Sequence, residues 1–150
     1  MIKDQKGFTL PELLITVAIT GLIASFLGTA IYQIITVTEY GNDKATATHE
    51  LQNAAHWVSR DGQMASTASG GNRLTLTLPD GSSITYTKVA NELRRTAGKS
   101  RMAIAQNISS VSFSVVDRLI TMTITSSPPG RTNVNEQGTY KVCLRPGAEE

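Results

Sequence analysis

Residues 6–38 read KGFTLPELLITVAITGLIASFLGTAIYQIITVT, and residues 13–38 within this stretch carry no charged side chain. As a helix, an uncharged run of that length extends about 39 Å at roughly 1.5 Å per residue. A bilayer core about 30 Å thick needs about 20 apolar residues. The sequence therefore predicts one membrane-spanning helix in this stretch.

The start of this helix is marked by residues 9–12, Thr-Leu-Pro-Glu. Thr9 can cap the helix by accepting a backbone N–H, and Glu12, three residues later, can close a capping box. Pro11 is tolerated because a residue in the first turn has no intrahelical N–H bond to lose. We therefore expect the helix to begin close to Leu10.

Charge around the span predicts its orientation. Lys3 and Lys6 precede the span and are offset only by Asp4. Positive charge next to a span stays cytoplasmic, so the N-terminus should face the cytoplasm and residues from Glu39 onward should lie outside.

The helical pattern continues beyond the span. Leu51, Ala54 and Val58 recur at helical spacing among polar residues, which is typical of an amphipathic helix. We expect a leader at residues 1–7, a transmembrane or filament-core helix at 8–38, an amphipathic extension at 39–66, and a β-rich globular head at 67–150.

The head is expected to be β because apolar residues alternate with threonines. Residues 74–78 and 84–87 flank a turn at 79–82 and predict one hairpin. Residues 111–116 and 119–125, joined at 117–118, predict a second hairpin, and 140–144 a last strand after a long irregular loop at 126–138. The predicted fold class is α+β, with the long N-terminal helix packed on an antiparallel sheet of about four to six strands.

The segment KGFTLPELLI, residues 6–15, resembles the N-terminal signature of type IV prepilins and type II secretion pseudopilins. That signature has a basic leader ending in glycine, then phenylalanine, a glutamate four residues later, and an apolar helix. The resemblance implies cleavage by a prepilin peptidase between Gly7 and Phe8 and N-methylation of Phe8. It further implies a subunit held in the inner membrane that assembles with other subunits through the inner-membrane machinery, with no cofactor. The motif is shared by all subtypes, but many major pilins close a C-terminal loop with a disulfide that this chain cannot form, so we expect a minor pilin or pseudopilin.

Two interpretations of Glu12 follow. The capping box, with attraction to the positive end of the helix, explains the carboxylate by stability alone. The resemblance implies instead a role in assembly, in which Glu12 pairs with the free amine of a neighbouring subunit's Phe8. Gly21, Ser25 and Gly28 have the spacing of small residues that let helices pack closely, although such spacing also arises by chance in membrane helices.

Other candidates are weaker. His49 and His56 are seven residues apart and are expected to be solvated, because zinc-binding helices use a spacing of four. Basic residues at 94, 95, 99 and 101 predict a solvated loop, because no aromatic residues are interleaved for nucleic-acid binding. Cys143, the only cysteine, excludes an intrachain disulfide and is expected to be a small core residue.

No catalytic motif is present, so an enzyme is not predicted. Two rival interpretations remain open. Residues 28–30, Gly-Thr-Ala, could serve as a signal-peptidase site and release a secreted binding domain. A membrane-anchored enzyme with an unrecognised site is the other rival.

Overall fold

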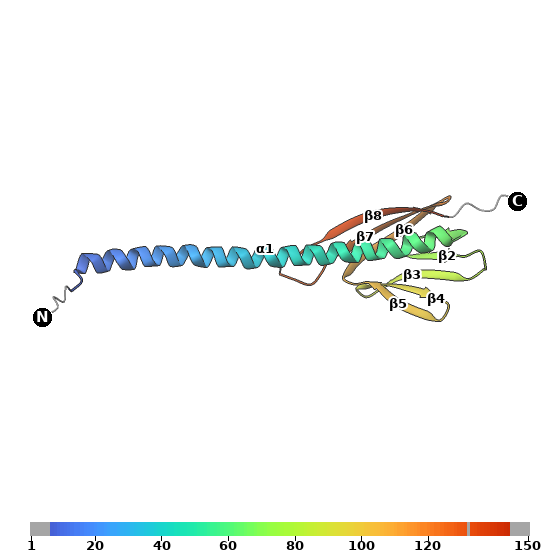
Figure 1. The fold of residues 1–150 in the computed structure, drawn as a ribbon. Coiled ribbons are helices and arrows are strands. Elements are labelled where there is room, and N and C mark those ends of the chain that lie inside the picture. Colours follow the sequence, from blue (N-terminus) through green and yellow to red (C-terminus); the bar gives the residue numbers. More distant parts are fainter. Residues whose placement is uncertain (1–6, 132, 145–150) are drawn as a thin grey trace. The chain divides into compact units, whose positions relative to one another are not determined.

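The computed structural model describes residues 7–131 and 133–144. Its helix, α1, covers Leu10–Met64 (Figure 1). The chain divides into two compact units, a first unit at Met1–Thr38 and a second unit at Glu39–Glu150. The boundary between the units therefore falls within α1.

The second unit combines the end of α1 with two antiparallel sheets. Its described strands are β1 Thr67–Ser69, β2 Arg73–Thr77, β3 Ser83–Val89, β4 Glu92–Ala97, β5 Ser100–Ala105, β6 Ile108–Val116, β7 Leu119–Ser126 and β8 Glu136–Cys143. One sheet has the order β1-β2-β3-β4-β5 and the other β6-β7-β8. The predicted α+β fold with a long helix on antiparallel strands is confirmed, but the strands form two sheets rather than one.

Tight turns connect most neighbouring strands. The predicted turn at 117–118 joins β6 to β7, with Val116 paired to Leu119 and Asp117 at φ 53°. Between β2 and β3, the Asp80 carboxylate accepts bonds from the hydroxyl and the backbone N–H of Ser82. The bond from the hydroxyl, followed by that from the N–H, lowers the pKa of Asp80. Both bonds fix the turn from within its own residues.

Residues 92–105 correct the sequence-based prediction. The basic stretch at 94–101 was expected to be a solvated loop, whereas β4 and β5 form a hairpin there with Gly98 at φ 56°. The predicted small core residue Cys143 lies in β8 but is exposed, because Val142, next to it in the strand, takes the buried side.

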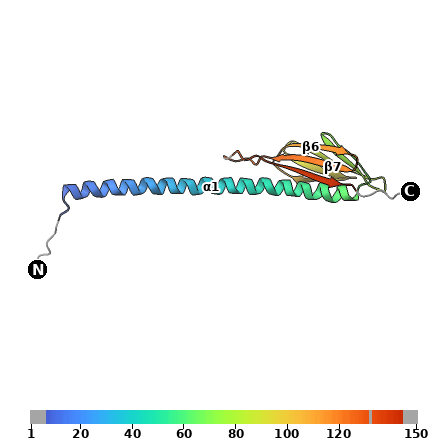
Figure 2. The same cartoon turned by 90° about the horizontal axis from the view of Figure 1, so that it is seen from above.

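A single core joins both sheets to the end of α1. Leu51, Ala54 and Val58 are buried on one stripe of the helix and cluster with inward side chains of both sheets. Figure 2 shows both sheets on the same side of this part of α1. The connection between the sheets is a bridge in which Gly71 and Phe113 exchange backbone hydrogen bonds of 2.7 and 3.0 Å.

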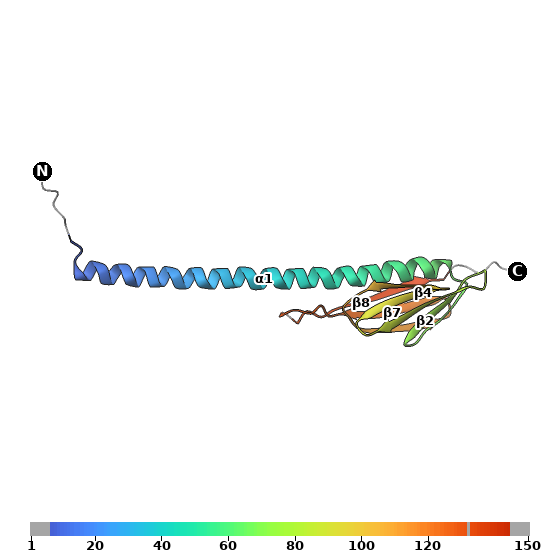
Figure 3. The same ribbon diagram turned by 90° about the horizontal axis from the view of Figure 1, so that it is seen from below.

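The connection from β7 to β8 is shorter than predicted, since β8 already begins at Glu136. It runs beside the part of α1 that belongs to the second unit (Figure 3). Lys44 on α1 forms an ion pair of 3.5 Å with Glu136 at its end, and Pro128 and Val134 within it are buried. The ion pair links the end of this connection to the helix.

Candidate functional site

The residues predicted to be cut lie in an open position ahead of the helix. Phe8 is 83% exposed, and both Gly7 and Phe8 precede α1. A Cβ built on Gly7 would meet no atom within 4 Å. Packing within the described chain therefore gives no reason for glycine at position 7.

Glu12 forms the glutamate half of the predicted capping box. Its Oε2 accepts the Thr9 backbone N–H at 3.0 Å and the Thr9 hydroxyl at 2.8 Å. Leu13 N–H in turn donates to the Thr9 carbonyl at 3.1 Å, so Thr9 is the N-cap. Within residues 7–131 and 133–144 no group bonds to Oε1, and this exposed oxygen is open to a further donor.

Hydroxyl groups in the first unit are satisfied by their own helix. Each serine and threonine between residues 13 and 38 donates to the carbonyl four residues earlier, at distances from 2.6 to 3.0 Å, and these residues are Thr16, Thr20, Ser25, Thr29, Thr36 and Thr38. Unsatisfied polar groups are costly where water is absent. These side chains are therefore compatible with hydrocarbon around the helix.

Apolar side chains in the first unit are uncovered. Leu22, Phe26 and Ile31, for example, are each more than half exposed. An 18-residue window of α1 has a mean hydropathy of 2.1, none of it buried, so the helix is long and apolar enough to cross a membrane. An exposed apolar surface of this size requires a lipid or protein partner.

The predicted packing residues lie within this uncovered surface. Gly21 and Gly28 have no atom within 4 Å of an added Cβ, and the Ser25 hydroxyl bonds to the Gly21 carbonyl at 2.9 Å. Positions 21, 25 and 28 share one helix face by their spacing. Nothing in the described chain occupies that face.

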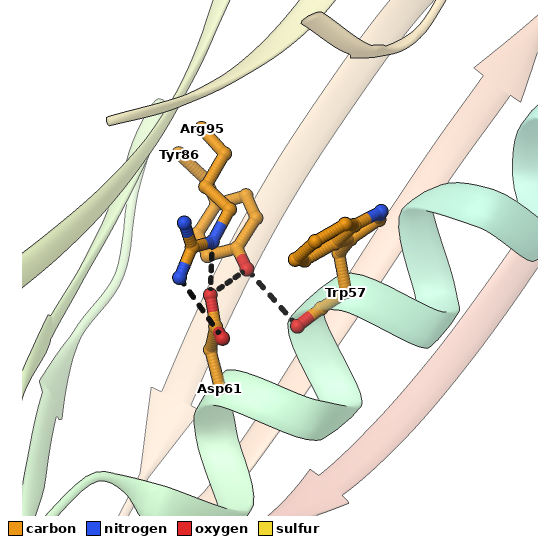
Figure 4. A network of polar contacts seen from close by, with 4 residues as sticks. All are labelled: Trp57, Asp61, Tyr86 and Arg95. Carbon is orange, nitrogen blue, oxygen red and sulfur yellow. Dashed lines mark hydrogen bonds and ion pairs between the residues drawn. The ribbon is translucent and has the colours of Figure 1, made fainter. Parts of the chain in front are cut away.

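Sequence reasoning did not pair a second carboxylate, Asp61, which is 1% exposed on the buried stripe of α1. Arg95 on β4 donates to it through Nε at 2.5 Å and through Nη2 at 3.2 Å. The Tyr86 hydroxyl on β3 bonds to Asp61 Oδ2 and lies 3.0 Å from the Trp57 carbonyl oxygen (Figure 4). Asp61 thus connects the end of α1 to two strands.

The surroundings of this buried cluster shift two pKa values. Burial, followed by the bond to Asp61, raises the pKa of Tyr86 far above its usual value of 10.0. The bond to Asp61 raises the pKa of Arg95. Two arginines lie over the ring of Trp57. The guanidinium carbon of Arg95 is 5.2 Å from the ring centroid, and that of Arg60 is 5.3 Å from it.

A sequence signal for this cluster exists. Asp61 follows Leu51, Ala54 and Val58 at the same helical spacing, and a charged residue on an apolar stripe is rarely buried without a partner. Arg95 could not be identified as this partner from the sequence, because it lies in a stretch of basic residues that indicated a loop. The guanidinium neutralises the carboxylate in place, so the pair is suited to fastening the helix rather than to proton transfer.

The predicted histidines lie on α1, and the ring of His56 lies edge-on to that of Trp57, with the centroids 6.4 Å apart. His49 and His56 are exposed, as expected for solvated side chains. Among the residues that the structure describes, no three His, Cys, Asp or Glu side chains are placed to hold a metal ion. The described chain therefore offers two features to interpret: the N-terminal motif with its uncovered helix, and the buried fastening of the helix end.

Comparison with known proteins identifies the first feature. Residues 2–28 match the prokaryotic N-terminal methylation motif. No curated protein and no solved structure matches the chain. The chain carries the type IV pilin and pseudopilin type of N-terminal signature, and its long helix on antiparallel sheets is pilin-like.

This signature has direct consequences. It implies processing by a prepilin peptidase and assembly with other pilin-type subunits. The single apolar helix and the motif fit membrane anchoring, and the motif and the fold fit a structural protein.

Proposed function

We propose that the protein is a minor pilin or pseudopilin, a structural subunit of a type IV pilus-like or type II secretion filament. The observation that carries this proposal is the methylation motif at residues 2–28, which overlaps the start of an uncovered apolar helix beginning at Leu10. A secretory signal is discarded with its apolar core. A prepilin retains that core, and the retained surface must then be buried in lipid or among sibling helices.

Processing is proposed to occur between Gly7 and Phe8, followed by methylation of the new amine of Phe8. The open backbone at these residues would give a peptidase access to the bond. Since no contact within the described chain requires glycine at position 7, the requirement is proposed to come from the peptidase, which would be crowded by a side chain there.

The anchored form is proposed to lie in the inner membrane as a single-pass protein. Lys3 and Lys6 would keep the N-terminus cytoplasmic, and the second unit would be extracytoplasmic. The internal hydrogen bonds of the six hydroxyls support a hydrocarbon environment for residues 13–38.

Assembly is proposed to proceed through the same helix. The open oxygen Oε1 of Glu12 would accept the amine of a neighbour's Phe8 while Oε2 stays bonded to Thr9. The face of Gly21, Ser25 and Gly28 would allow a sibling helix to approach closely. In an isolated subunit, Glu12 Oε1 lacks a donor and the small-residue face lacks a packing partner. Neighbouring subunits of a filament would supply both.

The experiment is N-terminal mass spectrometry of protein from cells that contain prepilin peptidase. Wild-type protein should begin at Phe8 and carry one added methyl group, whereas Gly7→Val should leave the leader attached. Gly28→Val, the same substitution inside the helix, is the matched control and should be cleaved normally. A mature chain beginning at Ile31 would instead show signal-peptidase cleavage and a secreted domain.

A further inference from the structure

The sheets of the second unit lie on one side of α1 (Figure 2), and alternate residues of their strands are turned away from the buried core. Strand registers and alternating burial place the side chains of these residues in cross-strand rows. On the five-stranded sheet these are Thr75, Thr77, Ser83, Thr85, Thr87 and Thr96 with Arg73, Arg94 and Arg101. On the three-stranded sheet they are Ser110, Ser112, Ser114, Thr121, Thr123, Thr125, Gln137, Thr139 and Lys141. We call this set the outer face.

Hydroxyl groups dominate the outer face. Threonine favours strands, so its abundance alone is explained by sheet stability. On the three-stranded sheet, hydroxyls meet across strands between Ser110 and Thr125 at 3.0 Å and between Thr123 and Thr139 at 3.4 Å. Each such group can both donate and accept, and the face therefore presents a lattice of paired donors and acceptors without an aromatic ring.

The arginines are not explained by sheet stability. Glu92, at the end of the same face, pairs with Arg94 at 2.9 Å. Within residues 7–131 and 133–144, neither Arg73 nor Arg101 has an ion-pair partner. The five-stranded part of the outer face thus has more positive than negative charge, which favours an anionic partner.

A hollow brings two of these arginines together. Arg94 and Arg101 line an open depression of about 240 Å³ with Glu92, Met102 and Ala103. Pockets that enclose a drug-sized ligand are larger, about 300–1,000 Å³. The depression therefore suits a single charged group of a longer chain that lies across the sheet.

We propose that the outer face binds an acidic polysaccharide, with carboxylates at Arg73, Arg94 and Arg101 and sugar hydroxyls on the threonine rows. This inference does not depend on the filament role. A polysaccharide offers both donors and acceptors, which match the hydroxyl rows, and its carboxylates complement the positive charge of the arginines. Single-stranded nucleic acid is bound by basic grooves with stacked aromatic rings, and the outer face has no such ring.

The test uses the full chain in detergent micelles and two immobilised probes, alginate and duplex DNA, with neutral dextran as a blank. Arg73→Ser, Arg94→Ser and Arg101→Ser combined should weaken alginate binding about tenfold or more, because charge-assisted bonds are lost. Lys44→Ser, Arg60→Ser and Arg131→Ser combined give the same change in charge away from the outer face and should leave alginate binding unchanged.

A second variant separates the two anionic partners. Thr85→Val and Thr96→Val, which are neighbours in one row, keep the shape and every charge but remove two hydroxyls. This variant should bind alginate several-fold more weakly, roughly as expected for two lost hydrogen bonds, with unfolding in denaturant unchanged. No binding to alginate, equal loss in the charge-matched control, or tighter binding to DNA that ignores the threonines would overturn the proposal.

Discussion

The two units contain parts of the same helix in opposite situations. In the first unit, α1 is apolar all round and no part of its hydrophobic window is buried. In the second unit, α1 is polar except for one stripe, and that stripe is buried against both sheets. Secondary structure is shared, whereas the partner that stabilises it differs: a membrane or other helices in one case and the chain's own strands in the other.

The carboxylates of α1 show the same contrast. The Glu12 side chain is exposed, and within residues 7–131 and 133–144 its hydrogen bonds go to Thr9, three residues away in sequence. Asp61 is buried and bonds to Tyr86 and Arg95, which are distant in sequence. A buried charge paired within its own chain fastens a fold, and an exposed charge at the edge of an apolar helix is available to another molecule.

The largest expected effect concerns the open carboxylate. Glu12→Leu should keep membrane insertion and cleavage, because the span becomes more apolar and residues 7–8 are untouched. It should lose nearly all incorporation into filaments, since the neighbour's amine has no charged partner. The measurement compares its share in sheared filaments with the membrane pool, after expression with the partner subunits.

Two further variants sharpen this prediction. Glu12→Asp keeps the charge but shortens the side chain, and its incorporation should be intermediate. Glu12→Gln keeps the side-chain length and a hydrogen-bond acceptor for Thr9 but removes the charge. If Glu12→Gln and Glu12→Leu both assemble normally, Glu12 is only a helix cap.

Removing the buried carboxylate of Asp61 should lower the free energy of unfolding and should not change the specificity of assembly. Asp61→Ala leaves the largely buried Arg95 without its partner, and losing one member of a buried pair costs about 3–5 kcal/mol. Unfolding of the full chain by denaturant, in detergent and followed by the fluorescence of Trp57, the only tryptophan, gives the change. Lys44→Ala, which breaks the exposed pair with Glu136, should cost less than about 1 kcal/mol.

A double variant distinguishes the cost of an unpaired buried charge from the cost of lost packing. Asp61→Leu with Arg95→Leu removes both charges and keeps apolar volume, so much of the lost stability should return. If the double variant is as unstable as Asp61→Ala, the loss comes from packing or from the Tyr86 bond and not from an unpaired charge.

Matched leucines test the contrast between the two parts of the helix. Leu51 is 4% exposed and Leu22 is 61% exposed. Leu51→Ala should destabilise the second unit by about 2–5 kcal/mol, because a buried cavity is created. Leu22→Ala should leave the unfolding of the second unit, reported by Trp57, unchanged. Equal effects of the two substitutions would mean that the first unit also packs on the core.

The sequence predicted the features that depend on local pattern. The helix start at Leu10, after the cap Thr9, and the first-hairpin strands at 74–77 and 84–87 follow from caps and alternation near each residue. The β4–β5 hairpin was missed because Arg94 and Arg95 interrupt the apolar alternation, although Gly98 marked its turn. Arg95 takes an inward position only because Asp61 lies opposite, and this long-range pairing cannot be obtained from the pattern of either segment alone.

The smallest expected effect concerns alkaline pH. The pKa of Tyr86 is raised in the folded protein, so folded Tyr86 stays neutral while the unfolded chain ionises above its usual value of 10.0. The stability that Tyr86 contributes is therefore complete below about pH 10 and is lost as the pH rises beyond it. At pH 11, one unit above the usual pKa of tyrosine, ionisation of this group in the unfolded chain lowers the free energy of unfolding by about 1.4 kcal/mol.

Tyr86→Phe isolates this effect. The variant loses the bond to Asp61 and should be less stable at neutral pH by about 1–3 kcal/mol. Its stability should then fall less steeply than that of the wild type between pH 9 and 11, in denaturant titrations followed by Trp57 fluorescence. Tyr140→Phe on β8 removes a hydroxyl outside this cluster and serves as the matched control. An unchanged slope in Tyr86→Phe would mean that the buried hydroxyl ionises as readily in the folded chain as in the unfolded one, and that the Asp61 cluster does not exclude a second negative charge.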